Sequence, residues 1–193
     1  GNELINVWLA QQGRPSNSMN PVEQLCFIGA RGMGALEFEP SDFAKQKKVF
    51  DLEIDSLIEI TQKMLNDRQA FTADLTEDQQ VAMENVLRIG TSAGGARPKA
   101  IIAYNQKTGK IKSGQLTTPK GFEHWLIKLD GVEKGSDHVG DSLGYGRIEM
   151  AYYLMAKAAG IDMMESQLLE ENGRAHFMTK RFDRDGNNTK YHI

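Results

Sequence analysis

Hydrophobic residues recur three and four positions apart in two stretches of the N-terminal half, which predicts two amphipathic helices. The first stretch covers residues 51–66 and has its apolar positions at Ile54, Leu57, Ile58, Met64 and Leu65. The second begins at Thr76, which has capping-box spacing with Gln79 and precedes Met83, Val86 and Leu87. These helices are expected to form a small accessory unit for packing or partner contact.

A shorter helix is expected before them, because Asn20 can cap it, Pro21 suits its first position and Gly29 can end it. Its apolar face would consist of Val22, Leu25, Cys26 and Phe27. The glycine-rich segment 29–34 lacks GxGxxG spacing and follows no strand, so a turn with unusual backbone angles is favoured over a nucleotide loop. That turn is expected to lead into a strand at 35–38.

The pattern changes near residue 88 to short apolar runs separated by polar turns. Strands are predicted at 100–104, 122–129, 168–169 and 175–182. The Asn172-Gly173 pair between the last two is the best hairpin signal in the chain. A helix is predicted at 147–159, with a core face at Ile148, Ala151, Tyr152, Met155 and Ala159. The fold class is therefore α+β, with units at 1–88 and 89–193.

Composition narrows the class of protein. The 193 residues are 40% hydrophobic and 25% charged, which is typical of a globular protein and excludes disordered and collagen-like chains. A net charge of −3 gives no bulk attraction to nucleic acid. The single cysteine, Cys26, cannot form an internal disulfide. No apolar run approaches the ~20 residues that span a bilayer, and no signal peptide is visible. We therefore expect a cytoplasmic protein without membrane contact.

Lys128 is the first candidate for chemistry, because it interrupts the apolar strand His124–Leu129. A buried ammonium group needs a partner, so Lys128 either reaches solvent at an edge or meets an anion. Glu149 borders the core face of the following helix and could reach it. A glycine-rich loop, a strand lysine and a helix glutamate, in that order, are the ATP-holding parts of a protein-kinase N-lobe.

Four segments together resemble the HipA family, whose members are bacterial serine/threonine kinases and the toxins of toxin–antitoxin modules. They are Thr91–Lys99 (TSAGGARPK), His124–Lys128 (HWLIK), the helix from Glu149 to Ile161, and Lys180–Arg184 (KRFDR). The segment Gly32–Phe38 (GMGALEF) is less specifically similar to the family's N-terminal subdomain. The resemblance implies an accessory subdomain followed by a kinase-like N-lobe, in which an antiparallel sheet carries one main helix.

The resemblance also implies the roles of individual residues in holding ATP with Mg²⁺. Glu149 would hold the ATP-binding lysine in place, and Ser92 would be the autophosphorylation site that switches the enzyme off, with Thr91 as the neighbouring alternative. The implied ATP-binding residues are Gly94, Gly95, Ala96, Arg97, Pro98, Lys99, Lys128, Lys180, Arg181 and Phe182. The implied partners are a HipB-like DNA-binding antitoxin, which would connect the protein to DNA only indirectly, and protein substrates that include aminoacyl-tRNA synthetases.

The catalytic aspartate and the Mg²⁺ ligands of the family are expected beyond Ile193, so we predict no catalytic residue here. The four histidines lack the spacing of a zinc site, and no metal site is predicted. The chain is thus interpreted as the N-terminal portion of a HipA-like kinase, inactive by itself. The alternative is a free-standing binding module that neutralises or scaffolds a separate kinase half.

Overall fold

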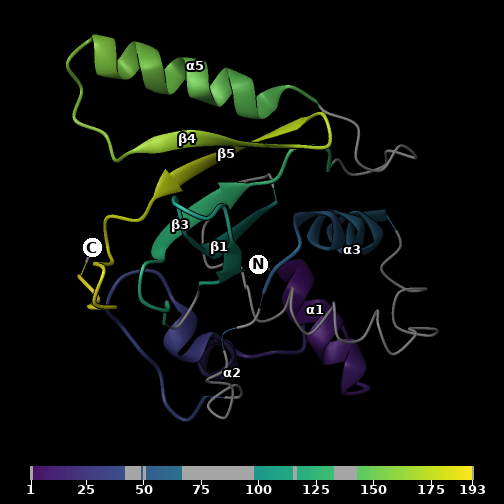
Figure 1. The fold of residues 1–193 in the computed structure, drawn as a ribbon. Helices are drawn as coiled ribbons and strands as arrows, with labels where there is room; N and C mark the ends of the chain where they lie inside the picture. The colour runs from purple at the N-terminus through teal and green to yellow at the C-terminus, as the bar shows by residue number, and fades with distance from the viewer. Residues whose placement is uncertain are drawn as a thin grey trace.

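The computed structural model describes residues 2–41, 49, 51–66, 98–114, 117–132 and 143–192 (Figure 1). The N-terminal elements are α1 (Asn2–Gln11), α2 (Pro21–Ile28), the 3₁₀ turn η1 (Gly29–Arg31) and α3 (Ile54–Asn66). They are followed by β1 (Lys99–Tyr104), β2 (Ile111–Ser113), β3 (Glu123–Lys128), α5 (Tyr145–Ala158), β4 (Ser166–Glu171) and β5 (Arg174–Lys180). The expected helix from Thr76 lies outside the described residues.

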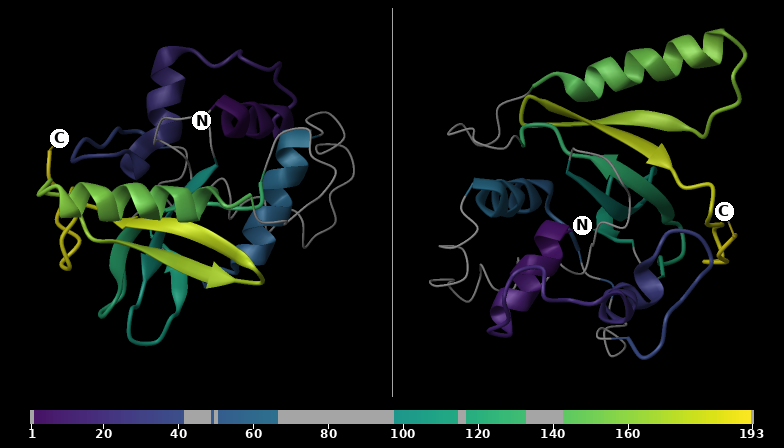
Figure 2. Two further views of the ribbon diagram at one scale, coloured as in Figure 1. Left: turned by 90° about the horizontal axis from the view of Figure 1, so that it is seen from above. Right: turned by 180° about the vertical axis from the view of Figure 1, so that it is seen from behind.

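One five-stranded antiparallel sheet organises the second half, with strand order β2-β1-β3-β5-β4. Two turns connect the strands of its two hairpins, β1–β2 and β4–β5. Asn105 opens the first by accepting the N–H groups of Lys107 and Thr108, and Asn172-Gly173 forms the second with positive φ at both residues. Helix α5 runs along β4 and β5, as Figures 1 and 2 both show. The predicted α+β class is confirmed.

The hydrophobic core is shared by both halves of the chain. Leu9 of α1, Phe27 of α2 and Ile58 of α3 pack in one cluster with Trp125 and Ile127 of β3. Strand residues alternate between faces, so the side chains of β3 at 125 and 127 point towards the N-terminal helices and that of Lys128 points to the other face. The sheet therefore separates the N-terminal helices from α5.

The predicted core face of α5 is wrong. Ile148, Tyr152 and Met155 are 52%, 66% and 56% exposed, and Ala151 and Ala159 are exposed as well. The helix instead turns its less exposed side to β4 and β5, with Gly146 pressed against the backbone of β5 at Ala175. The spacing of apolar residues identifies an apolar stripe on a helix, but it does not show which side of the helix packs against another element.

The N-terminal forty residues agree only in part with their predictions. Asn20 caps α2 in a full capping box with Glu23, Pro21 begins it and Gly29 ends it, as expected. Of the predicted apolar face only Phe27 is buried, and Val22 is 68% exposed. The expected strand at 35–38 is wrong, since this segment has no regular structure. Helix α1 and the short strand β2 were not predicted.

Candidate functional site

The face of the sheet beneath α5 brings Lys128 and Glu149 together. Lys128 ends β3, Glu149 lies about one turn into α5, and Lys128 Nζ donates a hydrogen bond to Glu149 Oε2. Their side chains are 32% and 25% exposed, so water reaches the pair from one side. Phe177 lies opposite Lys128 on β5, and its ring centroid is 5.6 Å from Lys128 Nζ. Ring and carboxylate hold the ammonium group at one place on the sheet.

Lys99 is the second cation of this face. It pairs directly with Lys128 across β1 and β3, and directly opposite residues project from the same face. Lys99 is only 8% exposed. Burial lowers its pKa, the charge of Lys128 lowers it further, and Glu149 partly opposes both effects. Two ammonium groups and the Glu149 carboxylate therefore share this face of the sheet. We call Lys99, Lys128 and Glu149 the lysine site.

Lys180 lies on the opposite face of the sheet. It is paired with Trp125, a residue of the core face, and its Nζ donates to Glu123 Oε1. Its side chain is 31% exposed at the end of the sheet. The structure therefore does not bring Lys180 to the lysine site, and its contact with ATP stays a prediction.

The segment after β5 holds a buried charge cluster formed by Arg181, Asp183 and Arg184. Arg181 Nε and Nη2 donate to the two Asp183 carboxylate oxygens at 2.7 and 2.5 Å. Arg184 Nη1 donates to Asp183 Oδ2 at 3.0 Å and to the Gly34 carbonyl at 2.9 Å. The Gly34 N–H completes the cluster by donating to Asp183 Oδ2 at 2.7 Å. We call this arrangement the tail clasp.

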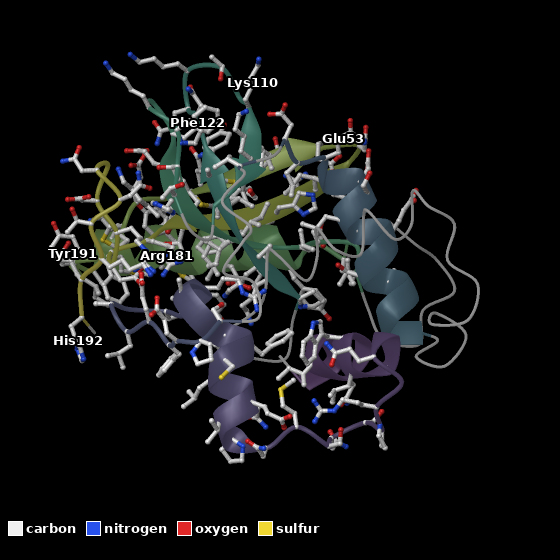
Figure 3. The ribbon with its side chains drawn as sticks, turned by 90° about the horizontal axis from the view of Figure 1, so that it is seen from below. Glu53, Lys110, Phe122, Arg181, Tyr191 and His192 are labelled. Carbon is white, nitrogen blue, oxygen red and sulfur yellow. The ribbon has the colours of Figure 1, made fainter. Side chains whose placement is uncertain are left out.

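The tail clasp joins the end of the sheet to the segment after α2, and Figure 3 labels Arg181 at this end of the sheet. The side chains of Arg181, Asp183 and Arg184 are 1–2% exposed. Burial would raise the pKa of Asp183, but hydrogen bonds from Arg181 and Gly34 and the charges of both arginines outweigh it and lower that pKa to about 2. Arg181 is thus committed to a structural ion pair, and its contact with ATP stays a prediction.

The remaining predicted site residues are only partly described. Phe182 is 61% exposed. The Pro98 carbonyl accepts the N–H of Leu129, which ties the start of β1 to the residue after β3. Thr91, Ser92, Gly94, Gly95, Ala96 and Arg97 lie outside the described residues. The predictions for this loop therefore stay predictions.

A polar network near the lysine site was not predicted. Asp130, two residues after Lys128, accepts the N–H of Leu143 at 3.0 Å and that of Ala175 at 3.2 Å. The N–H of Asp130 donates to Nδ1 of His176 at 2.8 Å, and Nε2 of His176 contacts Glu171 at 2.9 Å. A histidine inside the apolar strand 174–180 was the available signal, because a buried imidazole needs two partners.

Two kinds of feature are not found in the part of the chain that the structure describes. No group of three or more histidine, cysteine, aspartate or glutamate side chains there is placed to hold a metal ion. No helix there is long and apolar enough to cross a membrane.

The fold and the site together define an α+β protein in which a lysine of the central antiparallel strand is held by a glutamate of the helix that follows. Among known families, the model of the HipA-like C-terminal domain matches residues 91–193, which is more than half of the chain. The chain belongs to the HipA family, which is known as a family of serine/threonine kinases from toxin–antitoxin systems. A comparison with curated proteins gives no match.

Proposed function

We propose that the chain carries the ATP-holding lobe of a HipA-type kinase that transfers the γ-phosphate of ATP to a serine or threonine of a protein. The observation that carries this proposal is the ion pair between Lys128 and Glu149. In protein kinases a lysine of the third strand pairs with a glutamate of the helix that follows, and the lysine contacts the ATP phosphates. Among the described elements, Lys128 likewise ends the third strand, β3, and Glu149 lies in the helix that follows it, α5.

Lys128 and Lys99 would hold the phosphates, because both are cations on one face and neither is fully hydrated. A partly desolvated ammonium group interacts with an anion more strongly than one in open water. Glu149 would keep Lys128 in position. The backbone amides of Gly94, Gly95 and Ala96, with Arg97, would cover the phosphates from above. Mg²⁺ bound with ATP would neutralise charge on the transferring phosphate.

The finer parts of the proposal concern regulation and partners. Phosphorylation of Ser92, or of Thr91 beside it, would add about two negative charges to the loop and repel ATP, which makes it an off-switch. A HipB-like DNA-binding antitoxin would be the partner, and aminoacyl-tRNA synthetases would be among the substrates. The protein would act in the cytoplasm. The family membership supports these proposals.

The test is ATP binding by the purified chain, measured with a fluorescent ATP analogue in the presence of Mg²⁺. Lys128→Met should weaken binding at least about tenfold, because a charged hydrogen bond is worth about 1.5–3 kcal/mol. Lys112→Met is the matched control. Lys112 also pairs with a carboxylate, Asp51, and lies 5.8 Å from an aromatic ring, that of Phe122, but belongs to strand β2.

Unchanged binding in Lys112→Met together with loss in Lys128→Met supports the proposal. Equal binding by the chain and its Lys128→Met variant contradicts it. Transfer is tested separately in the full-length protein, by incubating it with γ-labelled ATP and locating the label by mass spectrometry. We expect label on Ser92 or Thr91, and a full-length protein that labels neither itself nor any protein would refute the kinase assignment.

A further inference from the structure

The N-terminal end of α5 is attached to the sheet through Asp130, a residue close in sequence to Lys128 of the lysine site. Asp130 follows Lys128 by two residues, and Leu143 precedes Glu149 by six. The Asp130 carboxylate joins them, because Oδ1 accepts the Leu143 N–H and Oδ2 accepts the Ala175 N–H of β5. One side chain thus links the end of β3, the start of α5 and the start of β5.

Asp130 is itself held rigidly. It is 3% exposed, and its N–H donates to Nδ1 of His176, which leaves Nε2 of that neutral ring to donate to Glu171. Glu171 also accepts from Arg174 Nε at 2.8 Å, and Arg174 pairs with Asp55 of α3. A continuous polar chain therefore leads from Asp55 of α3 to the backbone N–H of Asp130, the residue whose carboxylate holds α5.

Close packing of backbone strengthens the same attachment. A Cβ atom on Gly146 would overlap the carbonyl oxygen of Ala175, so the first turn of α5 touches the backbone of β5 directly. The middle of the helix has no such anchor on its outer side, where Ile148, Tyr152 and Met155 are more than half exposed. The position of Glu149 relative to Lys128 therefore depends on the attachment at Asp130 and Gly146, to which Arg147 of α5 adds an exposed ion pair with Glu170 of β4.

We propose that Asp130 is a positioning residue for the lysine site, which sets the distance between Glu149 and Lys128 by fixing the start of α5. This inference rests on the proposed function, since the lysine site matters as an ATP-holding pair. It does not need Asp130 to touch ATP. Asp130→Asn tests it, because an amide group presents an NH₂ to one of the two backbone N–H groups and loses that hydrogen bond.

The readout is the rate at which Lys128 is reductively methylated in the native chain, quantified by mass spectrometry of its peptide. An ammonium group paired with a carboxylate reacts slowly, so loss of the pair should raise the rate about two- to fivefold, the factor that a partly exposed ion pair is worth. Glu149→Gln removes the charge of the partner and therefore gives the full increase in the Lys128 rate that loss of the pair can produce. Lys107, in the exposed turn after β1, serves as an internal reference for general opening of the fold.

We expect Asp130→Asn to raise the Lys128 rate towards that of Glu149→Gln, with Lys107 unchanged. The double variant should react no faster than Glu149→Gln alone, because both changes act through the same pair. Asp185→Asn is the matched control: it makes the same carboxylate-to-amide change at a side chain that also accepts two backbone N–H groups, but in the exposed turn after β5. It should leave the Lys128 rate unchanged.

A Lys128 rate that stays at the wild-type value in Asp130→Asn, while Glu149→Gln raises it, would overturn the inference. So would additive effects in the double variant. If Asp130→Asn does not fold, Gly146→Ala gives the second measurement, since its methyl group must push α5 away from Ala175, and it should raise the rate in the same way. If Lys128→Met binds ATP as tightly as the unchanged chain, only the proposed function is refuted. The methylation result for Asp130 then still holds.

Discussion

Replacing Asp183 with asparagine should strongly destabilise the fold. The carboxylate lies between the buried guanidinium groups of Arg181 and Arg184 and also accepts the N–H of Gly34. The amide side chain would keep the volume but leave two buried positive charges without a counter-charge. Removing one partner of a buried ion pair typically costs about 3–5 kcal/mol, because the charge that remains is poorly solvated.

The pKa of Asp183 gives a second value for the stability that its carboxylate contributes, and it shows how this contribution changes with pH. Its fall from 3.8 to about 2 corresponds to about 2–3 kcal/mol at 1.36 kcal/mol per unit. A carboxyl group with a lowered pKa stabilises the folded state fully above its unfolded pKa, and this contribution disappears as the pH falls. For Asp183 the loss should occur between about pH 4 and pH 2.

The assay is urea unfolding followed by tryptophan fluorescence, because Trp125 lies in the core and Trp8 packs against it. We expect Asp183→Asn to lower the free energy of unfolding by about 3 kcal/mol at pH 7 and to flatten the acid dependence between pH 4 and 2. Asp185→Asn is the control, since Asp185 lies next to the clasp but accepts only exposed hydrogen bonds, from its own turn and from the Tyr191 hydroxyl. A loss below about 1 kcal/mol with an unchanged acid profile would refute the reasoning.

Three further changes test the packing and the local contacts. Gly114→Ala should destabilise the chain by more than about 1 kcal/mol in the same urea assay, because a methyl group would overlap the backbone at Ile102. Asn20→Ala should cost about 1 kcal/mol by removing the cap of α2, and a change under a few tenths would contradict the capping role. Burial lowers the pKa of His124 from 6.5 even though the hydrogen bond with Asn188 opposes it, so stability should fall as the pH drops below about 6.5. An NMR titration of His124 that gives a pKa above 6.5 would contradict this.

The β4–β5 hairpin could be predicted because local turn chemistry specifies it. Asn172-Gly173 adopts positive φ at both residues, which a two-residue hairpin turn requires, and the flanking runs then pair with each other. Lys128 and Glu149 could be connected for a similar reason. A charge inside an apolar strand needs a partner, and a strand lysine followed by a helix glutamate is the order found in a protein-kinase N-lobe.

Features that depend on pairing between distant segments could not be predicted. The face on which Lys180 lies follows from its register with Trp125, and a slip of one residue would have moved it to the other face. The orientation of α5 is set by the contact of Gly146 with β5, which the apolar stripe of the helix does not reveal. The tail clasp joins Gly34 to a residue 149 positions later.

The separation between Gly34 and Asp183 in the sequence also affects how the protein folds during translation. Translation adds roughly 5–20 residues per second, so roughly 8–30 s pass between the synthesis of Gly34 and that of its partner. Met178 of β5 belongs to the same core as Leu9 and Phe27 and emerges almost as late. During this interval α1 and α2 expose the apolar surface that the sheet later covers. The nascent chain therefore cannot complete this shared core until β5 has emerged.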